Sequence, residues 1–161
     1  MTSRAIYIAA TEPRADKGAA ARQLLTKIPD GQSVAIFRPV VEPEHDELTA
    51  NLLQVANCPL TVAEAIGVTP SDWANDQVKA THKIVDKFGQ LAKRFDNVVV
   101  VGSDYNSVIS ASALDVNVAV AANLNLPVVI VVDAKDRDRQ WVEGVVNNAK
   151  HAFEASGLSV V

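Results

Sequence analysis

The sequence has 161 residues and is poor in cysteine, in aromatic side chains and in long apolar runs. Its single cysteine, Cys58, excludes an intrachain disulfide framework and a zinc site built from several cysteines, so we expect a reducing compartment, the cytoplasm. The longest near-uninterrupted apolar runs, 98–101 and 127–132, are far shorter than the roughly 20 residues that span a bilayer. These short runs are therefore predicted to be buried strands. The start of the chain also lacks the charged and apolar regions of a signal peptide, so no signal peptide is predicted.

An excess of basic residues is missing as well. Lysine and arginine together number 15 against 19 acidic residues, which gives a formal net charge of −4. A chain with this balance lacks the positive field that attracts nucleic-acid phosphates or an anionic membrane surface. We therefore expect neither nucleic acid nor membrane as a partner, and instead a small polar ligand or another protein.

The sequence does contain a regular alternation of apolar strands and amphipathic helices. Hydrophobic residues make up 48% of it, which is typical of a globular chain, and the length suits one domain over residues 1–161. Strands are predicted at 4–10, 33–41, 97–102, 126–133 and 158–161. Helices are predicted at 17–28, 45–57, 76–95, 111–124 and 139–155, with a short one that begins at a Thr61–Glu64 capping box and ends near Gly67. This alternation predicts a three-layer αβα fold with a mainly parallel sheet.

The loop after the first strand is the first candidate for a ligand site, because open parallel sheets bind ligands at the carboxyl ends of their strands. The loop reads TEPRADKG, with Lys17 at the position of a phosphate-loop lysine. It has no glycine before that lysine, Pro13 has no backbone N–H, and Glu12 and Asp16 repel a phosphate. Gly18 replaces the hydroxyl residue that binds magnesium. These features favour a solvated loop that caps the first helix over triphosphate binding, and they predict no bound cofactor.

A smaller anion is compatible with the loops at this edge. Arg14 and Lys17 lie where a helix N-terminus favours negative charge. Arg38, near the end of the second strand, either aims into the same cleft or pairs with a neighbouring acid, and both interpretations stay open. Asp104 follows the strand 97–102 and has the chemistry to bind a metal or water, although capping of the next helix is the commoner role. The candidate anion- or effector-binding residues are thus Thr11, Arg14, Lys17, Arg38 and Asp104.

Neither a catalytic set nor a metal site is predicted. The histidines fall in three separate predicted helices without ligand spacing: His45, His82 and His151. Cys58 has no histidine nearby in the sequence and is predicted to be a small core residue. Asn117 and Asn123 are predicted to be surface or packing residues, and Trp73 and Trp141 to be packing anchors.

Four stretches of sequence together carry a resemblance to a known family. They are the loop TEPRADKG after IYIAA, then IFRPVVEP, then VVVVGSDY, and then ALDVNVAVAANLNLPVVIVVDA. In this order and spacing they resemble the amino-terminal domain of long-form bacterial phosphate acetyltransferase, which is similar to dethiobiotin synthetase. The resemblance covers essentially the whole chain, and it implies a P-loop NTPase-like fold of the dethiobiotin synthetase kind.

The resemblance also implies equivalences for the residues of the first two loops. Lys17 matches the P-loop lysine of dethiobiotin synthetase, whereas Asp16 and Gly18 stand in place of its glycine and threonine. Arg38 takes the place of a lysine that follows the second strand in that enzyme.

A further departure lies at the end of the strand 97–102. Val101 stands where an acid commonly precedes the glycine, so the magnesium-coordinating acid is lost unless Asp104 substitutes for it. The departures at this one site argue against an active ATP-dependent ligase, and they leave room for effector binding in a remodelled cleft.

The resemblance implies a parent enzyme that interconverts acetyl-CoA and phosphate with acetyl phosphate and CoA. In that family the chemistry belongs to a carboxyl-terminal acetyltransferase domain, which this chain does not include. We therefore expect a non-catalytic amino-terminal fragment of a longer chain, with a role in regulation and oligomer assembly. Its expected partners are its own acetyltransferase domain, further copies of itself and a small-metabolite effector.

Two alternatives from other functional classes stay open. One is an ATP-dependent ligase like dethiobiotin synthetase, which the order of elements and Lys17 motivate. The other is a free-standing interaction module that forms a homodimer and whose cleft has no ligand.

Overall fold

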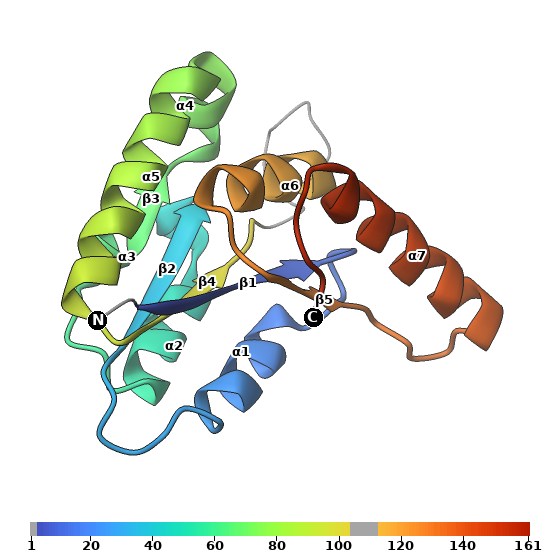
Figure 1. The fold of residues 1–161 in the computed structure, drawn as a ribbon, viewed down its shortest axis with the longest axis horizontal. Helices are drawn as coiled ribbons and strands as arrows, with labels where there is room; N and C mark the ends of the chain where they lie inside the picture. The colour runs from blue at the N-terminus through green and yellow to red at the C-terminus, as the bar shows by residue number, and fades with distance from the viewer. Residues whose placement is uncertain (1–2, 104–112) are drawn as a thin grey trace.

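The computed structural model of the chain describes residues 3–103 and 113–161. Within these ranges, five parallel strands form one sheet in the order β3-β2-β4-β1-β5. The strands are β1 (Arg4–Ala10), β2 (Val34–Val40), β3 (Ile66–Val68), β4 (Asn97–Val101) and β5 (Val128–Val131). Parallel neighbours require crossover connections, and each crossover contains at least one helix (Figure 1).

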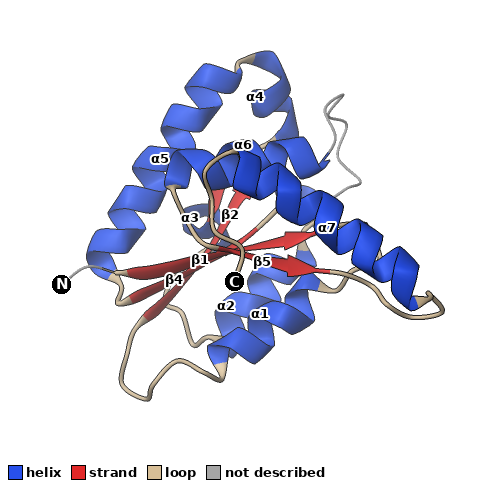
Figure 2. Cartoon of the chain, turned by 45° about the vertical axis from the view of Figure 1, so that its right-hand side comes forward, coloured by secondary structure: helices blue, strands red, loops and turns tan. Residues whose placement is uncertain are grey.

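Helices cover both faces of this sheet. They are α1 (Lys17–Leu25), α2 (Glu47–Val55), α3 (Val62–Ala65), α4 (Pro70–Asn75), α5 (Gln77–Arg94), α6 (Ala113–Leu124) and α7 (Arg139–Ala155). A 3₁₀ turn, η1 (Pro43–His45), precedes α2. Two views show α1 and α2 on one face and α5, α6 and α7 on the other (Figures 1 and 2). The three-layer αβα fold predicted from the sequence is confirmed, and the sheet is all-parallel over the described residues.

The core lies between the sheet and the two helical layers. β4 runs between β2 and β1 and is buried along its whole length, which explains its continuous apolar sequence. On one side of the sheet α5 buries Ile84 and Leu91, and their spacing of seven residues keeps both on one face of the helix. Because the five strands run in the same direction, the loops that follow them lie at one common edge of this buried sheet.

Several helices begin at a capping residue, whose side chain accepts a hydrogen bond from a backbone N–H group of the first turn. The capping box predicted at Thr61 and Glu64 is present and opens α3. A second capping box, formed by Thr69 and Asp72, opens α4, a helix that the sequence pattern did not predict. These caps compensate the unpaired donors of the first turn, and they allow helices as short as α3 and α4 to form.

Two predictions near the sheet differ from the structure. The short helix expected to end near Gly67 ends at Ala65, but the strand β3 that follows it was not predicted; Gly67 is its central residue, and a Cβ at this position would collide with the backbone carbonyl oxygen of Pro39 in β2. Because β3 has only three residues, it carries no detectable alternation in the sequence. The stretch 158–161 was expected to be a strand, but it forms a single parallel bridge between Val160 and Val128.

The boundaries of several predicted helices also differ, and the helix predicted at 76–95 spans Gln77–Arg94. The helix predicted at 17–28 ends at Leu25, and the helix predicted at 45–57 begins at Glu47 after the turn η1. The prediction for α7 agrees with the structure at both ends. Helix ends depend on local caps and turns more than on apolar periodicity, which explains why these errors fall at the ends.

Candidate functional site

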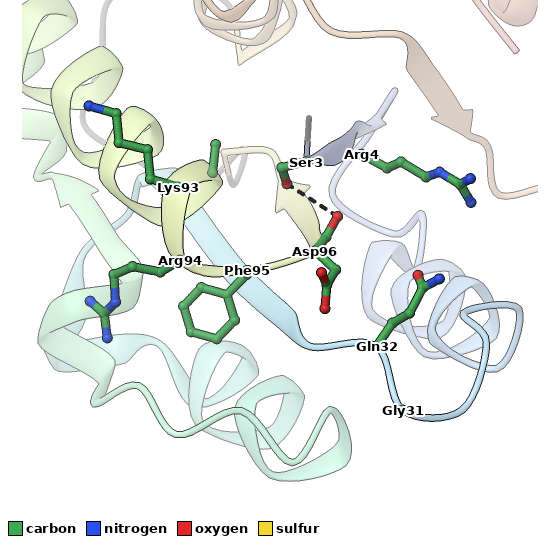
Figure 3. A pocket seen from close by; sticks show the side chains of 9 residues that line it. Ser3, Arg4, Gly31, Gln32, Lys93, Arg94, Phe95 and Asp96 are labelled. Atoms are coloured by element: carbon green, nitrogen blue, oxygen red, sulfur yellow. Dashed lines mark hydrogen bonds between the residues drawn. The ribbon is translucent and has the colours of Figure 1, made fainter. Parts of the chain in front are cut away.

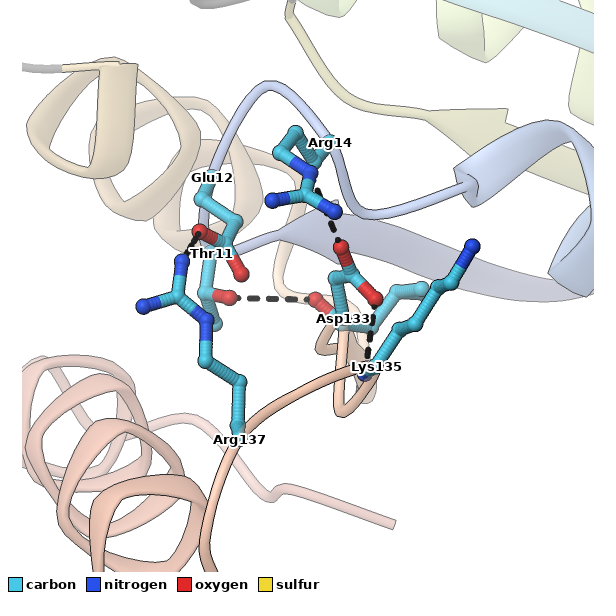
Figure 4. A network of polar contacts seen from close by, with 7 residues as sticks. Thr11, Glu12, Arg14, Asp133, Lys135 and Arg137 are labelled. Carbon is cyan, nitrogen blue, oxygen red and sulfur yellow. Dashed lines mark hydrogen bonds and ion pairs between the residues drawn. The ribbon is translucent and has the colours of Figure 1, made fainter.

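The carboxyl ends of the strands meet at one edge of the sheet, here called the carboxyl edge, where the loop after β1 lies beside the loop after β5 (Figure 4). The backbone N–H of Thr11 donates to the carbonyl oxygen of Val131 at 3.0 Å, and its hydroxyl donates to the same oxygen at 3.3 Å. Thr11 therefore extends the pairing of β1 with β5 beyond the end of the strand, and it positions the residues that follow.

Two ion pairs connect the same two loops, and we call them the loop latch. Arg14 Nε lies 3.2 Å from Asp133 Oδ2, and Arg137 Nη2 lies 3.6 Å from Glu12 Oε2 (Figure 4). The guanidinium of Arg137 also stacks over the ring of Trp141 in α7, 4.1 Å from its centroid. The latch thus joins the start of α1 to the start of α7 across the edge of the sheet.

Several backbone donors in the loop before α1 and in its first turn have partners within the chain. The N–H of Ala15 donates to the carbonyl oxygen of Glu12, and the N–H of Lys17 donates to that of Ala15. The carboxylate of Asp16 caps the helix and accepts from the N–H of Ala19 at 2.8 Å. A P-loop instead directs such N–H groups at a phosphate, so in this chain an internal carboxylate occupies the anion-favouring end of the helix.

Gly18 lies at a close approach between α1 and α2. A Cβ at this position would lie 2.7 Å from Leu48 Cδ1, so a larger residue requires Leu48 to move. The hydroxyl residue that the resemblance places here in dethiobiotin synthetase would meet this contact. Lys17, the first residue of α1, is 9% exposed and thus points into the protein rather than into solvent.

Arg38 pairs with an acid, which is one of the two interpretations that the sequence left open. Its side chain is fully buried, and Nη1 lies 2.8 Å from Oδ1 of Asp46, itself 3% exposed. Asp46 also accepts a hydrogen bond from the hydroxyl of Thr49 in α2. The pair joins β2 to the start of α2, and a role for Arg38 in effector binding stays a prediction.

A buried polar cluster lies where β4 ends. The hydroxyl of Tyr7 donates to Asn117 Oδ1 at 2.6 Å, and the backbone N–H of Ser103 donates to the same oxygen at 2.8 Å. Burial raises the pKa of the Tyr7 hydroxyl far above its usual value, an effect that the charge of Arg38 partly opposes. Asn117 is therefore a packing residue, one of the two roles predicted for it. Asp104 lies outside the described residues.

Thr11 and Arg14 were predicted as site residues from the sequence, whereas Asp133, which pairs with Arg14, and Arg137, which pairs with Glu12, were not. The signal available in the sequence was the charged segment directly after the last long apolar strand. It identifies a partner for the first loop only when β1 and β5 are known to be neighbours, and the order of strands is not readable from periodicity.

A hollow of about 580 Å³ lies at the opposite, amino edge of the sheet (Figure 3). Its lining includes Arg4, Lys93 and Arg94, whose side chains point in different directions, and Asp96. The carboxylate of Asp96 accepts hydrogen bonds from the N–H and hydroxyl of Ser33, which lower its pKa. The charged groups of this hollow therefore do not converge on one ligand position.

No group of three or more metal-ligating side chains occurs within 3–103 and 113–161. Among the helices in these ranges, none is both long and apolar enough to cross a membrane.

The all-parallel sheet of the described residues, its strand order and its two helical layers are those of a P-loop NTPase-like α/β domain. More particularly, the chain belongs to the family described as AAA domain, whose model matches residues 4–159. Among solved structures, the BceF tyrosine kinase domain is similar with a TM-score of 0.57 and 14% identity. The similarity covers 98% of this chain and 66% of that one, so the chain spans slightly less than two thirds of the kinase domain's length.

A second similar structure is a ParA family ATPase from Chlorobium tepidum TLS. It has 12% identity and a TM-score of 0.43, and the match covers 98% of this chain and 82% of that chain.

Proposed function

We propose that this chain is a regulatory and assembly domain that does not turn over ATP, and that its parent protein is a phosphate acetyltransferase. The observation that carries the proposal is the capping of α1 by the carboxylate of Asp16. A nucleotide phosphate at this helix start would meet an anion already hydrogen-bonded there, and like charges at hydrogen-bonding distance repel strongly.

The hydrogen bonds within the loop after β1 support the same proposal. Magnesium-ATP binding in the P-loop mode needs N–H groups that converge on the phosphates, and the N–H groups of Ala15 and Lys17 donate to carbonyl oxygens of the loop itself. The crowded position of Gly18 disfavours a magnesium-binding hydroxyl in the same turn. An NTPase-like fold with these features suits a domain that responds to a ligand without catalysing a reaction.

The link to phosphate acetyltransferase rests on the four sequence stretches that resemble its amino-terminal domain. On this proposal the acetyl transfer belongs to a carboxyl-terminal domain of the same protein, which acts in the cytoplasm. The present domain contacts that domain, takes part in a homo-oligomer and binds a small-metabolite effector.

Calorimetric titration with magnesium-ATP tests for nucleotide binding, and an assay of phosphate release tests for turnover. We expect no saturable binding tighter than about 100 µM, or roughly −5.5 kcal/mol, for the chain and for its Lys17→Ala variant alike. Tighter binding that disappears in Lys17→Ala, together with magnesium-dependent release of phosphate from ATP, contradicts the proposal. Circular dichroism of the variant controls for folding, because Lys17 is largely buried.

That contrary result would favour the second candidate, an ATP-dependent ligase like dethiobiotin synthetase. The placement of Lys17 as the first residue of α1, at the carboxyl edge, is the observation in its favour. Membership of the AAA-domain family is also compatible with ATP-dependent activity.

Deletion of residues 1–161 from the parent enzyme tests the regulatory part. Acetyl transfer should persist, while the response to metabolites and the oligomeric state should change. Unchanged regulation and unchanged assembly would overturn this part of the proposal.

A further inference from the structure

Glu12 is poorly accommodated within the loop latch. Its Oε1 atom is buried and accepts no hydrogen bond in the structure, and its Oε2 atom lies 3.6 Å from Arg137 Nη2. By contrast, both carboxylate oxygens of Asp133 have close partners, Arg14 Nε at 3.2 Å and the backbone N–H of Lys135 at 3.0 Å. A buried carboxylate oxygen without a donor carries a desolvation cost that the pair with Arg137 has to offset, so Glu12 is held less firmly than Asp133.

The ion pairs of the loop latch engage only some of the guanidinium N–H groups of Arg14 and Arg137. Arg14 is 60% exposed, and its ion pair engages Nε, which carries one of the five guanidinium N–H donors. Arg137 is one third exposed, and its stacking on Trp141 orients the guanidinium plane. The two side chains come from loops on neighbouring strands, with Glu12 and Thr11 between them (Figure 4).

We propose that Arg14 and Arg137 form a binding site for the phosphate group of a small metabolite, and that Glu12 holds this site closed as an internal competitor. The phosphate takes the place of the Glu12 carboxylate at Arg137 and accepts hydrogen bonds from the outer N–H groups of Arg14, because guanidinium groups bind phosphate in a bidentate geometry. Glu12 then turns into solvent. This inference rests on the proposed function, since it names the chemistry of the effector at the same edge.

The site differs from a P-loop in the groups that hold the phosphate. Side-chain guanidiniums replace backbone N–H groups, and this agrees with the internal use of the N–H groups of Ala15 and Lys17. Asp133 stays paired with Arg14 Nε and also accepts from the N–H of Lys135, so it partly opposes the anion and leaves the outer N–H groups of Arg14 for the phosphate, while Asp16 caps the start of α1. Among these acids, Glu12 is the one with an unbonded buried oxygen, and so the one released most easily.

Isothermal titration with inorganic phosphate tests the proposal. Glu12→Gln keeps the shape of the side chain and removes its charge, so we expect it to bind phosphate about tenfold more tightly than the unmodified chain. Adding Arg137→Gln to Glu12→Gln should abolish the gain. The matched control is Glu143→Gln, which removes the same charge from an arginine-paired acid on α7 and should leave phosphate binding unchanged.

Two results overturn the inference. In one, Glu12→Gln binds phosphate no more tightly than the unmodified chain, including the case in which neither binds. In the other, the gain survives Arg137→Gln, which means that the phosphate lies elsewhere. Thermal unfolding of each variant verifies that it is folded. ATP turnover that depends on Lys17 would refute the proposed function while leaving this comparison of phosphate affinities intact, so the two failures are distinguishable.

Discussion

Two arginine–carboxylate pairs at the same edge of the sheet differ in their access to water. Arg38 and Asp46 are buried, and their pair joins β2 to the start of α2. Arg14 is mostly exposed, and its pair with Asp133 joins two loops. A buried pair cannot exchange partners without leaving an uncompensated charge, whereas an exposed pair exchanges with water and ions at little cost. The same chemistry therefore provides a structural anchor at one end of the edge and an exchangeable contact at the other.

The largest expected effect comes from removing the acid of the buried pair. Asp46→Asn leaves the charge of Arg38 buried without a counter-charge, and we expect it to lower the free energy of unfolding by about 3–5 kcal/mol. Urea denaturation measures the change. The neighbouring exposed residue provides a control, because Glu47→Gln makes the same change in charge and should alter stability by less than about 0.5 kcal/mol. Equal losses for the two variants would show that the buried pair has no special role.

An intermediate effect is expected where polar groups are buried but uncharged. Asn117→Leu leaves the hydroxyl of Tyr7 and the N–H of Ser103 without their shared acceptor, which should lower the free energy of unfolding by about 1–3 kcal/mol. Asn123→Leu, on the exposed side of the same helix, is the control for loss of an amide. If the two variants lose the same stability in urea denaturation, the buried cluster at the end of β4 is not a stabilising feature.

The smallest effect is expected at the exposed pair. Arg14→Gln should change the free energy of unfolding by less than about 1 kcal/mol, because Arg14 is mostly in solvent. Salt sharpens the contrast, since screening removes surface charge effects and leaves buried ones largely intact. The Arg14→Gln difference should therefore vanish in 1 M sodium chloride while the Asp46→Asn difference persists. A large loss of unfolding free energy for Arg14→Gln that persists in high salt would show that the loop latch stabilises the fold as the buried pair does. Arg139→Gln, at a more exposed pair on α7, serves as control.

The sequence predicted the layers of this fold well because continuous apolar strands and amphipathic helices leave direct marks in it. β4 is apolar throughout since it is covered on both faces, and α5 carries its buried residues on one side. β3 left no such mark, because three residues are too few for a periodic pattern and Gly67 suggested a helix end. An element could thus be predicted when it was long enough to show a periodic or continuous apolar pattern.

The candidate site was predictable only in part. Arg14 and Lys17 were identified from their position after a strand, which needs local sequence alone. The pairing of Arg14 with Asp133 depends on β1 and β5 being neighbours, and the pairing of Arg38 with Asp46 depends on how the turn after β2 folds back. Such contacts arise from tertiary arrangement, so they appear only when the structure is known.

The glycine in β3 also bears on the behaviour of the protein in solution. β3 pairs with the outer edge of β2, a strand whose apolar residues would otherwise end the sheet with unpaired N–H and C=O groups. Because any side chain at position 67 collides with the carbonyl of Pro39, glycine is the residue that allows β3 to take this place. Gly67 thereby allows β3 to cover the end of β2's outer edge, and we expect a single added methyl group, in Gly67→Ala, to open this edge to pairing with strands of other molecules.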